Sequence, residues 1–279
     1  MREVIDAAAD ELAAAGVDSA RVDAELLAAH VAGTPRGRLT LTEPDAGFVS
    51  RYRELITQRA RRIPLQHLTG VAAFGPVTVD VGPGVFIPRP ETEVLLEWAM
   101  KLPLPDPPVI VDLCTGSGAL ALALATHYPR ARVVAVDDSE QALSYARRNV
   151  ADSAAGSGVE LLHADVTQPG LLTELDGTVD LLVSNPPYIP DNAALEPEVA
   201  QHDPAHALFG GPDGMAVIGP IVEAAGRLLR PGGFCAVEHD DTTSDRTAEV
   251  FRRSGRFDEI VARHDWTGKP RYVTAVRSQ

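Results

Sequence analysis

Apolar residues recur at helical spacing through the first 62 positions of the chain. The stretches REVIDAAADELAAAG (2–16) and ARVDAELLAAHVAG (20–33) repeat apolar residues every three to four positions, and each ends in a glycine, a common helix terminator. A third helix is predicted over residues 45–62. Glycine, proline and β-branched residues replace this pattern over 64–93, which indicates a β-hairpin and a connector.

Beyond residue 91, short apolar runs alternate with helical stretches. The runs predict strands at 109–113, 132–136, 159–163, 179–183 and 234–238. This alternation predicts an α/β fold, a doubly wound parallel sheet. Near the C-terminus FDEIVARH and RYVTAV flank the turn DWTGKP, which predicts a hairpin, so one antiparallel strand should close the sheet. We expect a helical domain at 1–70, a hairpin connector at 71–90 and an α/β domain at 91–279.

Composition and charge narrow the class of protein. The net charge of −14 argues against broad binding to nucleic-acid phosphates. The N-terminus carries acids where a signal peptide needs a basic start, and no apolar run reaches membrane-spanning length. Cys114 and Cys235 form neither a disulfide framework nor a zinc signature, and the histidines have no metal-ligand spacing. We expect a cytoplasmic protein without a metal, a membrane or stable nucleic-acid binding.

Residues 51–62, the arginine segment, concentrate positive charge on the third predicted helix. The segment holds five arginines, Arg51, Arg53, Arg59, Arg61 and Arg62. Such a run is usually a solvated helix face. The alternative is a docking surface for an acidic partner, and the sequence leaves both interpretations open.

The stretch VDLLVSNPPYIPDN places unusual residues directly after a buried strand. Pro186 and Pro187 cannot donate to a sheet, so strand pairing must end there. The stiff segment fixes two acceptors, the Asn185 side-chain oxygen and the Pro186 carbonyl, and Tyr188 adds an aromatic ring. Two acceptors and a ring suit a planar NH2 group. A proline-rich loop with an incidental asparagine is the alternative.

A glycine loop and three acids follow the first strands of the α/β region. Gly116 and Gly118 in VDLCTGSGALALALA allow a tight turn before a helix, in a loose match to a dinucleotide-binding pattern. Asp112 would repel a pyrophosphate there but attract a cationic amine. Asp137 ends the second strand and suits a ribose, and Asp165 follows the third. The series favours S-adenosylmethionine, which carries an ammonium, a sulfonium and a ribose but no phosphate, over a nicotinamide cofactor.

These motifs together resemble a known family. NPPY at 185–188, with DLCTGSG, AVDDSEQAL and FIPRPETE, closely resembles the release-factor glutamine N5-methyltransferases, the HemK/PrmC family. FIPRPETE (86–93) narrows the resemblance to this one family, because other amino-methyltransferases share NPPY-type motifs. The resemblance implies a Rossmann-like seven-stranded methyltransferase sheet in 91–279 and a substrate-recognition domain in 1–70. It further implies methylation of the glutamine in the Gly-Gly-Gln motif of peptide chain release factors.

The resemblance also assigns site residues. The residues expected to bind the cofactor, besides Asp112, are Phe86, Arg89, Pro90, Cys114, Thr115, Gly116, Ser117, Gly118, Asp137, Asp165, Val166 and Asn185. The residues expected to hold the glutamine side chain are Asn185, Pro186, Pro187 and Tyr188, with Asn185, Pro186 and Tyr188 as the catalytic set. Two positions depart from the family: Cys114 stands where glycine is frequent, and Val166 replaces an aromatic beside adenine.

The expected chemistry rests on positioning. An amide nitrogen is a poor nucleophile because its lone pair is delocalised into the carbonyl. Asn185 and the Pro186 carbonyl would accept both N–H groups and aim the nitrogen at the methyl group, while Tyr188 would pack on the amide. An N6-adenine methyltransferase acting on DNA or RNA would use a similar pocket and stays as the alternative. Glu238 and His239 receive no role from the sequence.

Overall fold

The structure, a computed structural model, describes all residues 1–279 and divides into two compact units. The helical unit comprises Met1–Val71 and Leu195–His202, and the sheet unit comprises Ala72–Ala194 and Asp203–Gln279. The sequence interpretation had placed 91–279 in one domain, whereas the structure groups Leu195–His202 with the N-terminal helices. No helix of the chain combines the length and the apolar character needed to cross a membrane.

Three helices of similar length build the helical unit. Its elements are α1 (Arg2–Ala14), α2 (Ala20–Ala32), the 3-10 helix η1 (Arg36–Leu41), α3 (Phe48–Ala60), α4 (Leu65–Thr69) and α8 (Pro197–His202). The core between them buries Leu12, Leu27, Phe48 and Ile56. Tyr52 is also buried, and its hydroxyl donates to the Ala24 carbonyl at 2.9 Å, so the ring joins the core without an unpaired polar atom.

Two residues of the arginine segment hold the α8 segment within this unit. Arg59 is 6% exposed, and it donates to Asp23 at 2.7 Å and to Glu198 at 3.0 Å. Arg62 donates to the same Glu198 oxygen at 2.6 Å. Burial would raise the pKa of Glu198, but the hydrogen bonds from Arg62 and Arg59 lower it to about 2. These ion pairs explain why residues far apart in sequence belong to one unit, and they leave Arg59 buried and Arg62 only partly exposed.

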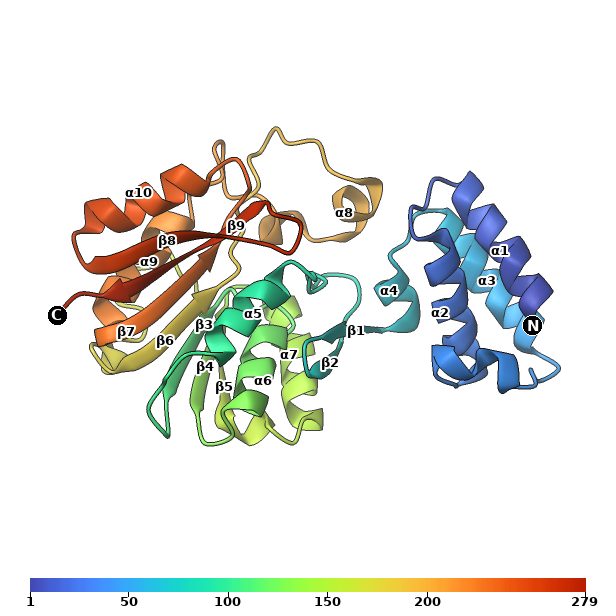
Figure 1. Cartoon of the computed structure of the whole chain (residues 1–279), viewed down its shortest axis with the longest axis horizontal. Coiled ribbons are helices and arrows are strands. Elements are labelled where there is room, and N and C mark those ends of the chain that lie inside the picture. Colours follow the sequence, from blue (N-terminus) through green and yellow to red (C-terminus); the bar gives the residue numbers. More distant parts are fainter. The chain divides into compact units, whose positions relative to one another are not determined.

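The sheet unit contains a seven-stranded sheet in the order β5-β4-β3-β6-β7-β9-β8 (Figure 1). Its strands are β3 (Val109–Leu113), β4 (Arg132–Asp137), β5 (Val159–His163), β6 (Val179–Ser184), β7 (Leu229–Glu238), β8 (Phe257–His264) and β9 (Pro270–Arg277). Strands β3 to β7 pair in parallel, and β9 is antiparallel to both β7 and β8. The predicted α/β fold with an antiparallel last strand is confirmed. That strand lies inside the sheet, however, because β9 inserts between β7 and β8, which forms the edge.

Helices cover both faces of this sheet (Figure 1). They are α5 (Thr92–Met100), α6 (Ala119–His127), α7 (Glu140–Asp152), α9 (Ile218–Leu228) and α10 (Ser244–Ser254), with short 3-10 turns at Gly156–Gly158, Thr173–Leu175 and Ala205–Ala207. One core cluster gathers side chains of α5, α6 and the hairpin of β1 (Val71–Phe74) and β2 (Val77–Asp80), and the other gathers those of α9 and α10. Burial on both faces explains why the inner parallel strands β3, β4 and β6 are largely apolar.

Candidate active site

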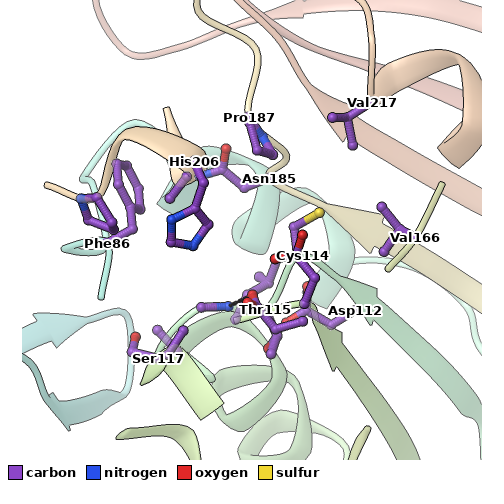
Figure 2. Close-up of a pocket in the computed structure, with 18 of the residues that line it drawn as sticks. Phe86, Asp112, Cys114, Thr115, Ser117, Val166, Asn185, Pro187, His206 and Val217 are labelled. Carbon is purple, nitrogen blue, oxygen red and sulfur yellow. Dashed lines mark hydrogen bonds between the residues drawn. The ribbon is translucent and has the colours of Figure 1, made fainter. Parts of the chain in front are cut away.

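A cavity opens in the sheet unit where the parallel strands β3, β4 and β6 end (Figure 2). Such an edge is where doubly wound sheets bind ligands. Eleven of the residues singled out from the sequence line it: Phe86, Asp112, Cys114, Thr115, Gly116, Ser117, Asp137, Asp165, Val166, Asn185 and Pro187. The structure therefore brings the glycine loop, the three acids and the asparagine of NPPY to one place.

The glycine loop between β3 and α6 turns through left-handed backbone conformations. Gly116 has φ of 59° and Gly118 has φ of 81°, values that glycine adopts without steric cost. Cys114 also has a positive φ, 63°, which costs a residue with a Cβ atom roughly 1 kcal/mol. The departure from glycine at this position is therefore a strained one. The loop closes on itself when the Thr115 hydroxyl donates to Asp112 at 2.6 Å.

Two acids under this loop are buried. Asp112 is 1% exposed, and burial raises its pKa to about 7, although the hydrogen bond from Thr115 works to lower it. Asp137 accepts from the backbone N–H of Gly116 at 2.8 Å and from that of Ser139 at 3.0 Å. Burial raises the pKa of Asp137 as well. A positively charged ligand group would stabilise the ionised form of these carboxyl groups, because burial alone disfavours it.

Asp165 and Val166 form another part of the cavity wall, after β5. The Asp165 carboxylate accepts from the N–H and the hydroxyl of Thr167, at 2.8 and 2.7 Å, and from the Gln168 side chain at 3.1 Å. The hydrogen bond from the Thr167 hydroxyl is the main reason that the pKa of Asp165 is lowered. This carboxylate is thus ionised and held in a fixed direction beside the apolar Val166.

Asn185 follows the last residue of β6 and faces the cavity. Its Nδ2 donates to the hydroxyl of Thr92 at 3.1 Å. Neither Asn185 Oδ1 nor the Pro186 carbonyl accepts a hydrogen bond from the protein. Both acceptors predicted from the sequence are therefore without a protein donor, and Asn185 lines the cavity.

Tyr188 differs from its expected place on a substrate amide. Its hydroxyl donates to Glu238 at 2.8 Å, and its ring packs against the core cluster of α9 and α10 rather than lining the cavity. Burial, and next the charge of Glu238, raise the pKa of Tyr188 well above its usual value. The partner that turns this ring away comes from β7, and the NPPY motif alone gives no sign of it.

Four further predicted residues do not line the cavity: Arg89, Pro90, Gly118 and Pro186. Arg89 forms an ion pair with Asp203, and its guanidinium lies 5.1 Å from the centre of the Phe86 ring. Arg89 thus supports the cavity wall through Phe86. Pro90 is exposed, and Pro88 takes its expected place in the wall. Gly118 caps α6, and Pro186 is buried.

Several lining residues had no assigned role from the sequence. They include Phe74, Pro88, Thr92, His206, Phe209 and Val217. Thr92 belongs to FIPRPETE and His206 to the loop after NPPY, so both lie in stretches that the sequence singled out. Their individual directions depend on how α5 and that loop fold over the sheet, which no local pattern specifies.

Two family profiles match the chain. The PrmC N-terminal domain covers residues 3–70, and the methyltransferase small domain covers residues 77–207. A release factor glutamine methyltransferase of Mycolicibacterium smegmatis is 66% identical over 99% of this chain and 98% of its own length. The chain belongs to the release factor glutamine methyltransferase family. The family predicted from the motifs is thereby confirmed.

Two more relatives of that name extend the match. The protein of Mycobacterium tuberculosis is 63% identical, over 99% of this chain and 91% of its own length. The protein of Streptomyces coelicolor is 47% identical, over 96% of this chain and 95% of its own length. Among solved structures, the hMettl16 catalytic domain in complex with the MAT2A 3'UTR hairpin 6 has a TM-score of 0.55 at 14% identity, over 72% of this chain and 74% of that one. At that identity it shows the methyltransferase fold alone.

Proposed function

We propose that this protein transfers a methyl group from S-adenosylmethionine to the side-chain amide nitrogen of the glutamine in the Gly-Gly-Gln motif of release factors. The observation that carries the proposal is Asn185, which lines an acidic cavity and whose Oδ1 accepts no hydrogen bond from the protein. The neighbouring Pro186 carbonyl, which is also without a protein donor, would be the second acceptor. A primary amide offers two N–H groups in one plane, and two fixed acceptors match them. The near-full-length relatives, named release factor glutamine methyltransferases, support the substrate class.

The residues of the cavity fit S-adenosylmethionine. Asp112 and Asp137 are buried acids that a cationic ligand would compensate, and the loop at Gly116 lets a ligand approach the backbone closely. Asp137 would accept from ribose hydroxyls, and Asp165 with Val166 would face the adenine. When bound, the cofactor supplies a methyl group activated by a sulfonium.

The chain itself supplies positioning rather than acid–base chemistry. Asn185 and the Pro186 carbonyl would hold the glutamine amide with its nitrogen directed at the methyl group. Pro186 and Pro187 restrict the backbone around these acceptors, so little reorganisation accompanies the reaction. The nitrogen carries an extra proton after methyl transfer and loses it to solvent.

A folded release factor, rather than a short peptide, is the proposed substrate. One glutamine side chain offers too little surface to be selected among all cellular glutamines, so further contacts must supply specificity. Arg51, Arg53 and Arg61 remain exposed in the helical unit, and Arg53 and Arg61 have no ion pair there. These arginines support a recognition role for the helical unit toward an acidic surface.

Mass spectrometry tests the proposal directly. Purified release factor incubated with enzyme and isotope-labelled S-adenosylmethionine should gain one methyl group on the Gly-Gly-Gln glutamine. Adenine-containing DNA and RNA oligonucleotides run in parallel should gain none. Methylated oligonucleotide with unmodified release factor would overturn the proposal in favour of an N6-adenine activity. Cytoplasmic location and the lack of stable nucleic-acid binding stay predictions.

A further inference from the structure

Glu238 is a fully buried carboxyl group at the end of β7 that the proposed chemistry does not use. It is 0% exposed and does not line the cavity. Its Oε1 accepts the hydroxyl of Tyr188 at 2.8 Å. Its Oε2 is equally buried and has no hydrogen bond of good geometry. A buried carboxyl oxygen of this kind calls for a donor nearby.

Thr92, the first residue of α5, lines the cavity and is 4% exposed. Its Oγ1 accepts from Asn185 Nδ2 at 3.1 Å, so its own hydroxyl proton is left to donate elsewhere. Burial raises the pKa of Glu238 to about 7, and Tyr188 and then Thr92 oppose this as hydrogen-bond donors. The Thr92 hydroxyl is thus the donor available to Oε2.

We propose that Thr92 and Glu238 are positioning residues that fix the orientation of the Asn185 amide. Asn185 Nδ2–H donates to Thr92, Thr92 donates to Glu238 Oε2, and Tyr188 donates to Glu238 Oε1. The first and last residues of NPPY are then held by one carboxyl group. The inference rests on the proposed function only for the substrate group that Asn185 Oδ1 binds. The hydrogen bonds among Asn185, Thr92, Glu238 and Tyr188 do not depend on it.

The carboxylate sets the direction of the whole chain of hydrogen bonds. An asparagine amide can rotate by 180° and exchange its oxygen with its nitrogen, and a threonine hydroxyl accepts or donates with equal ease. When ionised, the Glu238 carboxylate only accepts, so it obliges Thr92 to donate to it. Thr92 can then only accept from Asn185, which directs Nδ2 inward and leaves Oδ1 toward the cavity.

Variants at Thr92 test the role kinetically. Thr92→Val keeps the shape and removes the hydroxyl, so kcat on release factor should fall roughly tenfold to a hundredfold, the worth of one buried hydrogen bond. KM for release factor and the affinity for S-adenosylhomocysteine should change less than about threefold. Thr92→Ser should rescue most of the loss. Thr247→Val is the matched control, because this threonine is also buried, lies in α10 and bonds only weakly to Met215.

Glu238→Gln tests the direction of the chain. The new amide can donate to Thr92, so Thr92 no longer has to accept from Asn185. A loss of kcat similar to that of Thr92→Val is expected, and the double variant should be little worse than either single one because both act through Asn185. Additive losses, or normal kcat in Thr92→Val, would overturn the inference.

Nuclear magnetic resonance of the side-chain amide of Asn185 separates this inference from the proposed function, because it needs no substrate. The resonance is assigned by its loss in Asn185→Ala. In Thr92→Val and in Glu238→Gln it should shift and its protons should exchange faster with water, while Thr247→Val leaves it unchanged. An Asn185 amide insensitive to both variants would refute the network even if release factor is methylated. A sensitive amide in an enzyme without that activity would refute only the proposed function.

Discussion

Asn185 carries the chemistry of the site at the scale of a single residue. Removing its side chain in Asn185→Ala takes away one of the two acceptors while the cofactor pocket keeps its acids. We expect kcat on release factor to fall by roughly 10²–10³, the effect of losing one well-placed polar group in an active site. Calorimetry should show S-adenosylhomocysteine binding within a few-fold of wild type.

Asn192→Ala provides the control for that experiment, since Asn192 is an exposed asparagine of the following loop. It should retain wild-type kcat. Near-normal turnover in Asn185→Ala would contradict the role assigned to the amide acceptor.

Asp112 ties cofactor binding and stability to pH. Its pKa of about 7 in the folded protein lies above the ordinary value of 3.8. Folding therefore favours the protonated form, and stability is lost as pH rises from about 4 to about 7. Asp112→Asn should remove this dependence, so its unfolding free energy relative to wild type should rise by up to about 1.4 kcal/mol per pH unit across that window. Urea titrations at several pH values measure it.

Binding of the ammonium group of S-adenosylhomocysteine should show the opposite trend. This group binds best when Asp112 is ionised, so affinity for S-adenosylhomocysteine should increase from pH 5.5 to 7.5 in wild type. In Asp112→Asn the affinity should be weaker and nearly flat over this range. Equal pH profiles for the two proteins would show that Asp112 does not face the amine.

The sequence predicted these acids and Asn185 because each lies at or just after the end of a predicted strand, a position that depends only on local pattern. It did not predict the direction of Tyr188, which depends on Glu238, a residue 50 positions further along the chain. Thr92 was missed for the same reason: its partner, Asn185, is 93 positions away.

At the scale of elements, Asn149 joins the hairpin to the cofactor loop. From α7 it accepts from the Asp80 N–H at 2.7 Å and donates to the carbonyls of Asp80 at 3.1 Å and Ser117 at 2.9 Å. Asn149→Ala would leave buried backbone groups of two elements unpaired. We expect a loss of roughly 2 kcal/mol in unfolding free energy and a weaker affinity for S-adenosylhomocysteine.

Urea unfolding and calorimetry on the same samples measure both effects, with Asn192→Ala again as the exposed control. If stability fell while cofactor affinity stayed at its wild-type value, Asn149 would support the hairpin without shaping the loop at Ser117.

Elements with a strong repeat were predictable and short ones were not. Parallel strands such as Val109–Leu113 and Val179–Ser184 are covered on both faces and read as apolar runs. The helices Leu65–Thr69 and Pro197–His202 span at most two turns, too short to show an apolar period. The insertion of β9 between β7 and β8 was also missed, because a hairpin pattern gives the pairing of its strands but not their place in the sheet.

At the scale of the whole molecule, variants in the helical unit should impair the reaction with an intact release factor but not the reaction with a short peptide. The double variant Arg53→Glu, Arg61→Glu reverses two exposed charges of the helical unit. We expect KM for intact release factor to rise roughly threefold to tenfold, and more at low salt, because it removes electrostatic complementarity. Kinetics on a Gly-Gly-Gln peptide should stay unchanged.

Arg38→Glu is the matched control, an exposed arginine of the same unit outside the arginine segment. An equal rise of KM in this control would indicate a general charge effect. Unchanged KM in the double variant would remove the arginine segment from substrate recognition.

The ion pairs of Glu198 with Arg59 and Arg62 have a consequence for building chimaeras. The chain contributes to the helical unit twice, as Met1–Val71 and as Leu195–His202. A graft that replaces only the N-terminal 70 residues would leave Glu198 facing a foreign surface without its two guanidinium partners. A productive exchange between relatives therefore needs two crossover points, with residues 195–202 transplanted together with the helices that hold them.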